Sequence, residues 1–124
     1  MHEATAVVGI DVAKRKLDVA LVVGEKVKAK VVDNTPAGYT LLQHWLVERG
    51  AQPSDAHICL EATGPYSEAV ATALVDAGWR VSVINPARLK GFAQGELARN
   101  KTDRADAALL ARFCAAMQPS EVGS

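Results

Sequence analysis

The spacing of hydrophobic and polar positions changes partway along the chain. β-branched residues are frequent in three early runs, at residues 6–12, 17–23 and 27–32, and in the third run the apolar residues Val27, Ala29 and Val31 alternate with lysines. Alternation with a period of two is typical of strands with one buried face, and Gly24 and Glu25 between the last two runs indicate a hairpin turn. Three such runs without an intervening helical pattern predict an antiparallel meander.

Helical and strand patterns then alternate. Thr35 is a predicted N-cap, Pro36 suits the first helical position, and Gly50 is the expected end of the helix. Short apolar runs at residues 57–61 and 80–84 predict two buried strands, and apolar positions at helical spacing between them predict a second helix that ends at Gly78.

The last third of the chain is less regular. A short helical or irregular segment is expected up to Phe92, and residues 95–101 have no apolar period, so we predict a mobile loop there. Thr102 is the predicted N-cap of a last helix, which Pro119 ends. The element order is β-β-β-α-β-α-β-α, an α/β fold with a mixed sheet. We expect one domain over residues 1–118 and a disordered tail at 119–124.

Composition adds few constraints. With 124 residues and 49% hydrophobic residues, the chain is long enough for one domain with a real core. The 14 basic and 14 acidic residues leave a formal net charge of zero, so net charge gives no support to nucleic-acid binding. Cys59 and Cys114 lie in apolar stretches and are interpreted as buried free thiols. No apolar run approaches the ~20 residues of a membrane span, so we expect a cytoplasmic protein.

Four acidic residues form a candidate site. Asp11 and Glu61 end the first and fourth predicted strands, which would bring both carboxylates to one sheet edge if these strands are adjacent and parallel. Asp103 and Asp106 are three residues apart and therefore share a face of the last helix. Phosphodiester cleavage commonly uses two divalent cations, and Mg²⁺ prefers carboxylate oxygens. The four acids therefore predict a metal-dependent phosphoryl-transfer site.

Each acid also has an ordinary interpretation. A strand-end carboxylate such as Asp11 is often only solvated, and Asp103 suits the positive end of a helix dipole. Asp106 could form an ion pair with Arg104 or Lys101. Other acids, Asp18 among them, are interpreted as turn or surface residues. Spacing alone leaves the metal site and these structural roles open.

Basic residues are concentrated near the second pair of acids. Between residues 80 and 112 there are seven basic and three acidic side chains. A basic loop beside a metal site suits contact with phosphate groups, although ordinary solvated charge would produce the same pattern. We name Lys14, Arg99, Lys101 and Arg104 as candidate nucleic-acid contacts.

Four motifs follow one another in the order that one protein family uses. They are Gly9-Ile10-Asp11-Val12-Ala13-Lys14, Leu60-Glu61-Ala62-Thr63-Gly64, Asn85-Pro86 and Lys101-Thr102-Asp103-Arg104-Ala105-Asp106-Ala107. Together they resemble the N-terminal domain of the DEDD transposases, the insertion-sequence one-ten family, which includes the Piv-type DNA invertases. The resemblance extends from about Val7 to Met117.

The resemblance implies an RNase H-like fold with a five-stranded mixed sheet, related to the Holliday-junction resolvase RuvC. It implies that Asp11, Glu61, Asp103 and Asp106 are catalytic and bind Mg²⁺, with Mn²⁺ as a substitute. Members of the family move or invert DNA, several of them with a non-coding bridge RNA as guide, and act as dimers that assemble into tetramers in the bacterial or archaeal nucleoid. A second, C-terminal domain supplies a catalytic serine in that family, and no serine of this chain matches it.

Two other functions remain open from the residues alone. An actin-like ATPase or sugar-kinase fragment also opens with a Gly-Ile-Asp strand, but it needs a second phosphate loop. A non-catalytic RNA-binding or assembly module would use the same fold without a metal.

Overall fold

The computed structural model describes residues 6–100 and 107–121, apart from the side chains of residue 93 and of residues 95–100. Its elements follow the expected order, with one more helix, α3, between the last strand and the last helix. They are β1 (Ala6–Val12), β2 (Lys16–Val23), β3 (Lys26–Asp33), α1 (Pro36–Glu48), β4 (Ala56–Glu61), the 3-10 helix η1 (Gly64–Tyr66), α2 (Glu68–Asp76), β5 (Arg80–Ile84), α3 (Pro86–Asn100) and α4 (Ala107–Met117).

The five strands form one mixed sheet in the order β3-β2-β1-β4-β5. The hairpins β1–β2 and β2–β3 are antiparallel, whereas β4 lies parallel to β1 and β5 lies parallel to β4. This arrangement confirms the predicted meander, and it meets the condition set for the acid pair, since the first and fourth strands are adjacent and parallel. Since successive side chains of a strand point to opposite faces, each strand contributes to two different layers.

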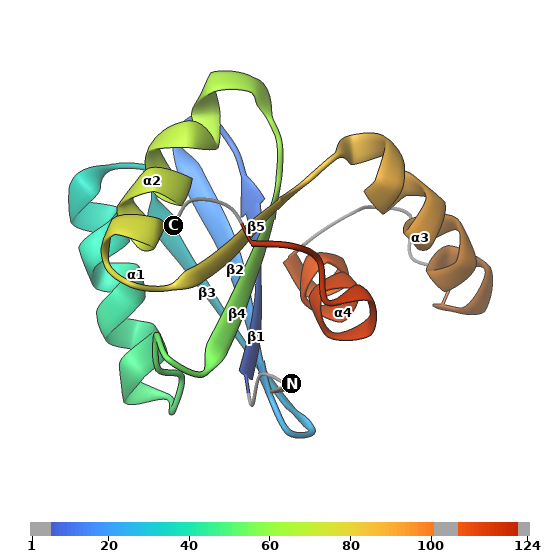
Figure 1. Ribbon diagram of the computed structural model, residues 1–124, viewed down its shortest axis with the longest axis horizontal. Coiled ribbons are helices and arrows are strands. Elements are labelled where there is room, and N and C mark those ends of the chain that lie inside the picture. Colours follow the sequence, from blue (N-terminus) through green and yellow to red (C-terminus); the bar gives the residue numbers. More distant parts are fainter. Residues whose placement is uncertain (1–5, 101–106, 122–124) are drawn as a thin grey trace.

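Helices lie on both faces of the sheet (Figure 1). On one face α1 and α2 pack over a large apolar cluster that includes Ile10, Leu46 and Ile58, all fully buried. On the other face α4 contacts β1, β4 and β2, and its Phe113 belongs to a second, smaller cluster. The sheet is thus the middle layer of a three-layer domain.

Local signals in the sequence account for the start and end of α1. The Thr35 hydroxyl accepts a hydrogen bond from the Gly38 amide at 3.1 Å, and Pro36 occupies the first turn, where its missing N–H costs no helical bond. After the helix, Gly50 adopts a φ of 98°, a conformation that glycine tolerates and other residues rarely adopt. None of the helices in the described part is long and apolar enough to cross a membrane.

Helix α3 differs from the prediction. The backbone is helical from Pro86 through Asn100, so the loop expected from residue 95 onward is wrong up to Asn100. A helix can form without an apolar period where the residues have high helix propensity, and residues 96–99 are mostly good helix formers. Near its middle, α3 contacts α4 through an edge-to-face pair of the Phe92 and Phe113 rings, whose centroids are 5.3 Å apart.

The segment after α4 makes contacts with β5. Helix α4 ends before Gln118, whose φ is 44°, and Pro119 follows. The Glu121 carboxylate lies 2.7 Å from Arg80 Nε. Of the tail expected to be disordered over residues 119–124, residues 119–121 therefore lie against the sheet, and residues 122–124 are outside the described part.

Candidate active site

Asp11 and Glu61 occupy equivalent positions on two adjacent parallel strands. The ladder between β1 and β4 pairs Ile10 with Leu60, so each acid is the next residue on its strand. Both side chains are partly buried. The predicted meeting of the two carboxylates at one edge of the sheet is therefore what the strand register produces.

The two carboxylates interact electrostatically. The pKa of Glu61 is raised above its usual value, first by burial and second by the negative charge of Asp11. Burial disfavours an ionised carboxylate, and a nearby like charge disfavours it further. A site that holds two acids under these conditions becomes more favourable when a cation neutralises them.

Helix α4 reaches this site because β1 has a glycine there. A Cβ at Gly9 would lie 2.0 Å from the Ala107 carbonyl oxygen and 2.5 Å from the Ala111 amide nitrogen. Only a residue without a side chain permits so close an approach of helix to strand. Gly9 is two residues before Asp11 and so shares its face of the sheet. The start of α4 therefore lies on the same face as the acid pair.

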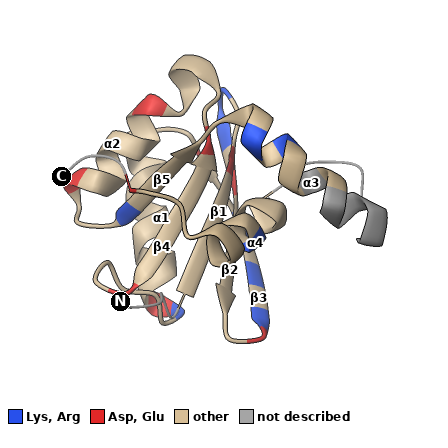
Figure 2. Ribbon diagram, turned by 45° about the vertical axis from the view of Figure 1, so that its right-hand side comes forward, with Lys and Arg blue, Asp and Glu red and all other residues tan. Residues whose placement is uncertain are grey.

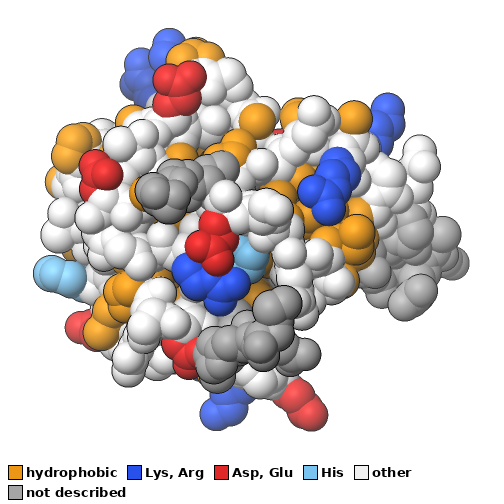
Figure 3. Space-filling model, viewed as in Figure 1, with side chains coloured by type: hydrophobic (Ala, Val, Ile, Leu, Met, Phe, Trp, Pro, Cys, Tyr) orange, Lys and Arg blue, Asp and Glu red, His pale blue; other side chains and the backbone are white. Residues whose placement is uncertain are grey.

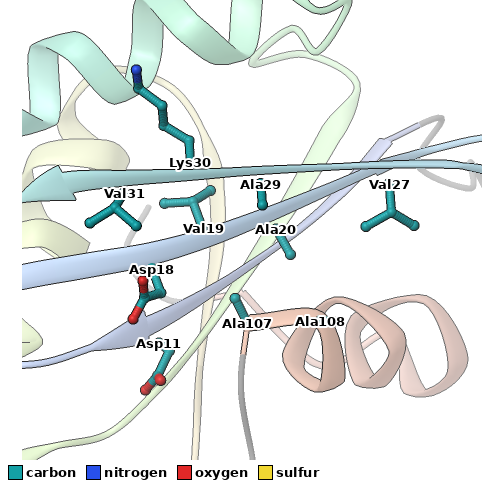
Figure 4. A pocket seen from close by; sticks show the side chains of 10 residues that line it. All are labelled: Asp11, Asp18, Val19, Ala20, Val27, Ala29, Lys30, Val31, Ala107 and Ala108. Carbon is teal, nitrogen blue, oxygen red and sulfur yellow. The ribbon is translucent and has the colours of Figure 1, made fainter.

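A cavity of about 270 Å³ lies beside Asp11. Asp18 of β2, which pairs directly with Asp11 in the antiparallel ladder, and Ala107 of α4 line the same cavity (Figure 4). Sequence analysis placed Asp18 among turn and surface residues. The signal that could have revealed it is the hairpin register, because a tight turn after Val12 brings Asp18 opposite Asp11 on the same face.

Asn34 joins the segments that flank the two acids. Its side-chain amide donates hydrogen bonds to the Ala13 carbonyl at 2.9 Å and to the Tyr66 carbonyl at 3.1 Å. Its oxygen accepts one from the Tyr39 hydroxyl at 2.6 Å, and its backbone amide donates to the Arg15 carbonyl. Because Ala13 follows β1 and Tyr66 follows β4, one side chain fixes the relative position of both acid-bearing strand ends.

Basic side chains gather at the β1–β2 turn on the same end of the sheet. Lys14, Arg15 and Lys16 are exposed and line a shallow cavity of about 500 Å³ together with Asn34. Lys16 Nζ lies 2.7 Å from Asp33 Oδ1. Figure 2 shows this basic turn and a second group of lysines along β3. Lys14, a candidate nucleic-acid contact, is thus close in sequence and in space to the strand end that carries Asp11.

The other candidates cannot be placed. Asp103, Asp106, Lys101 and Arg104 lie outside the described residues, as does the side chain of Arg99 on α3. What the structure does describe is Ala107, which directly follows Asp106 in the sequence and lines the cavity beside Asp11.

Comparison with known proteins identifies relatives of this chain. A family model for transposases, the DEDD transposases of the IS110 type, matches residues 8–122. The chain is 32% identical over 112 residues to the "Pilin gene-inverting protein" of Moraxella lacunata and, equally, to that of Moraxella bovis. The match spans 90% of this chain but only 35% of either relative.

Solved structures of RuvC share the fold. Thermus thermophilus RuvC in complex with a Holliday junction substrate superposes with a TM-score of 0.60 at 16% identity, covering 94% of this chain and 98% of that one. A second Thermus thermophilus RuvC structure gives a TM-score of 0.55 at 20% identity with the same coverage. The mixed sheet confirms the RNase H-like fold, and the family match leaves the actin-like ATPase hypothesis without support. The chain belongs to the DEDD transposase family.

Proposed function

We propose that this chain is the catalytic domain of a DNA transposase or recombinase that cleaves DNA phosphodiesters and transfers strands with Mg²⁺. The observation that carries the proposal is the adjacent pair Asp11 and Glu61 at the ends of β1 and β4. Family membership and the RuvC-like fold support the reaction class. The chain spans 35% of the length of its curated relatives, so the complete reaction is proposed for the whole protein.

The donor set fits a hard divalent cation. Carboxylate oxygens are the ligands that Mg²⁺ prefers, and Mn²⁺ accepts the same set. The raised pKa of Glu61 reflects burial and repulsion by Asp11, both of which a cation would offset. Asp103 and Asp106 are proposed as the remaining ligands, because Ala107, the next residue, lines the cavity beside Asp11.

The residues of the chain have separate tasks in this proposal. Mg²⁺, when bound, supplies the charge that activates the attacking oxygen and stabilises the leaving oxygen. Asp11 and Glu61 hold that charge on strands whose ladder leaves little freedom of movement. Asn34 keeps the two strand ends at a fixed spacing through its bonds to Ala13 and Tyr66.

DNA is the proposed substrate, and the proposed contacts are basic. Lys14 is exposed in the turn after β1, three residues after Asp11, and is proposed to contact phosphate groups of the DNA. Arg99, Lys101 and Arg104 are proposed contacts from the sequence pattern alone. The family resemblance supports a non-coding bridge RNA as guide, assembly of dimers into a tetramer, and action in the cytoplasm.

Metal binding and strand cleavage test the proposal separately. Mn²⁺ binding to the chain is measured by electron paramagnetic resonance, and nicking of supercoiled DNA is measured with the full-length protein. Asp11→Asn and Glu61→Gln should each weaken Mn²⁺ binding at least about tenfold, because each removes one of very few charged ligands. Each should reduce nicking by about 10³-fold or more, the order of magnitude expected when an electrostatic catalytic group is lost.

Asp76→Asn is the matched control, because Asp76 ends α2 on the opposite face of the sheet and should leave both measurements unchanged. Retained nicking in Asp11→Asn would refute the catalytic assignment. RNA binding that depends on salt but not on Mn²⁺, together with absent nicking, would instead support a non-catalytic assembly module.

A further inference from the structure

Three potential metal ligands meet in the core on the α4 face, apart from the acid pair. His57 and Cys59 lie two residues apart on β4, and Cys114 approaches them from α4. Their ligand atoms all lie within 4.8 Å of one another, and the three residues are at most 3% exposed. We propose that this His-Cys-Cys cluster binds one Zn²⁺ ion, which ties helix α4 to strand β4.

The hydrogen bonds around His57 prepare one ring nitrogen for a cation. Ser82 Oγ donates its single hydrogen to the Pro119 carbonyl at 3.2 Å. A hydroxyl that donates to Pro119 accepts from His57 Nε2 at their 2.7 Å contact, which corresponds to the tautomer with the proton on Nε2. In that tautomer the neutral ring has an unprotonated Nδ1, which is the nitrogen proposed to bind zinc. Metal-binding histidines typically donate their other N–H to such a partner, which fixes the tautomer and the ring orientation.

The two thiols are free and in contact. Neither cysteine forms a disulfide, and Cys114 Sγ lies 3.5 Å from the His57 carbonyl oxygen. Zinc binding would release two thiol protons to solvent and convert both sulfurs to thiolates.

The chemistry of the cluster distinguishes it from the acid pair. Thiolate and imidazole ligands favour Zn²⁺, whereas carboxylates at the strand ends favour Mg²⁺. With Zn–S bonds of about 2.3 Å and Zn–N bonds of about 2.0 Å, tetrahedral ligands lie about 3.5–3.8 Å apart. Closing the cluster from at most 4.8 Å to that spacing therefore shortens each distance between ligand atoms by no more than about 1.3 Å.

The cluster also has a covered outer side. Arg80 and Glu121 form an ion pair at 2.7 Å on the surface over β5, and Figure 3 shows an acidic and a basic side chain side by side on this face. Pro119, whose carbonyl accepts from Ser82 Oγ, is buried. Because the ligands are buried, zinc is expected to enter before α4 has packed on β4, that is, during folding.

A zinc ion here would act on the geometry of the proposed active site. β4 ends at Glu61, two residues after Cys59, and α4 begins at the residue after Asp106. A bond from Cys59 through zinc to Cys114 would hold these two elements together independently of Mg²⁺. The inference does not depend on the proposed function, because its test measures zinc and stability rather than cleavage.

The test is refolding of the chain with Zn²⁺ or Co²⁺, followed by removal of loosely bound ions. We expect about one zinc per chain by elemental mass spectrometry, a raised Tm, and, with Co²⁺, an absorption band from thiolate-to-cobalt charge transfer. Cys59→Ala and Cys114→Ala should abolish that band. Asp11→Asn should retain it, because carboxylate ligands produce no thiolate band.

Two further variants keep the outcome interpretable if a cysteine variant fails to fold. Ser82→Ala preserves all three ligands but removes the partner of His57 Nε2, so zinc affinity should fall by about 10–100-fold while the cobalt band remains. His44→Ala, an exposed histidine on α1, should change nothing. Folded wild-type chain without bound zinc and without the cobalt band would overturn the proposal, as would a band that survives in Cys59→Ala.

Discussion

Helices α1 and α2 cover one face of the sheet with a broad apolar layer, whereas on the other face α4 alone packs on the centre of the sheet. Among the described residues, 21 buried residues form the first cluster and nine form the second. Beyond the edge of α4, Val27 and Val31 of β3 remain 60% and 56% exposed. The first face is closed by packing, and the second is left partly open.

The candidate chemistry is on the thinly covered face. Asp11 shares that face with Gly9, and the cavity beside Asp11 is bordered by Ala107 of α4. The buried polar side chains His57 and Ser82 are there as well. A carboxylate pair needs access to solvent and ligand, and the thick apolar layer provides neither. The comparison indicates that packing on the α1–α2 face stabilises the fold. The α4 face is less fully packed and carries the candidate site.

The largest effect on stability is expected on the covered face. Leu46→Ala removes a fully buried side chain of α1 and should lower the free energy of unfolding by about 2–5 kcal/mol, because it leaves a cavity. Leu41→Ala on the same helix is the matched control, since Leu41 is 59% exposed and its loss should cost less than about 0.5 kcal/mol. Urea denaturation of both variants provides the measurement.

Folded Leu46→Ala should keep the Mn²⁺ affinity of the wild-type chain, because the substitution lies on the face away from the acids. If Leu46→Ala lost Mn²⁺ affinity without losing stability, packing on the α1–α2 face would affect the acid pair directly, and the two faces would not act independently.

An intermediate loss of stability is expected at the point where α4 lies closest to β1. Gly9→Ala would place a methyl group 2.0 Å from the Ala107 carbonyl oxygen, which forces α4 away from β1. The expected cost is about 1–3 kcal/mol, as for other overpacked positions, together with weaker Mn²⁺ binding. Gly91→Ala is the control, because a Cβ there meets nothing within 4 Å and alanine favours the α3 helix. Equal effects of the two substitutions in thermal denaturation would contradict the close contact.

Local signals made most of the fold predictable. The Thr35 cap, the Gly24 turn and the alternating strands each depend on neighbours in sequence, and the structure confirms them. The sequence gives both acids a strand-end position, but their pairing required the first and fourth strands to be adjacent and parallel, which the structure shows.

Features that depend on long-range contacts were not predictable. The backbone of residues 95–100 is helical, although no apolar period predicts a helix there. Asp18 became a candidate only through its register with Asp11, and Cys59 meets Cys114 only because α4 packs on β4. The register of Asp18 and the meeting of the two cysteines depend on which surfaces meet in three dimensions, which spacing within one segment does not encode. The helix at residues 95–100 has a local cause instead, because good helix formers make a helix without an apolar period.

The smallest expected effect is on the acid pair itself. Unlike the other substitutions, it should raise the free energy of unfolding. Without metal, Glu61→Gln should stabilise the chain at pH 7, because burial and the charge of Asp11 raise the pKa of Glu61 in the folded state. A raised folded-state pKa means that the folded chain binds more protons than the unfolded chain above the usual glutamate pKa of 4.5. Wild-type stability therefore falls as the pH rises through the folded-state pKa, and the variant avoids this loss.

The gain should be below about 1 kcal/mol, since Glu61 is only partly buried and water screens the repulsion. It should vanish below the unfolded pKa, where both states are protonated. Unfolding curves at several pH values in a chelator measure it, with Glu25→Gln in the exposed β2–β3 turn as the control. Added Mg²⁺ should stabilise the wild-type chain more than Glu61→Gln and so reverse the order, because only the wild type keeps both carboxylates. If Glu61→Gln instead destabilises the metal-free chain at pH 7, the Glu61 carboxylate stabilises the fold, as the Leu46 side chain does. The two faces would then differ less in their contribution to stability than the helices that cover them suggest.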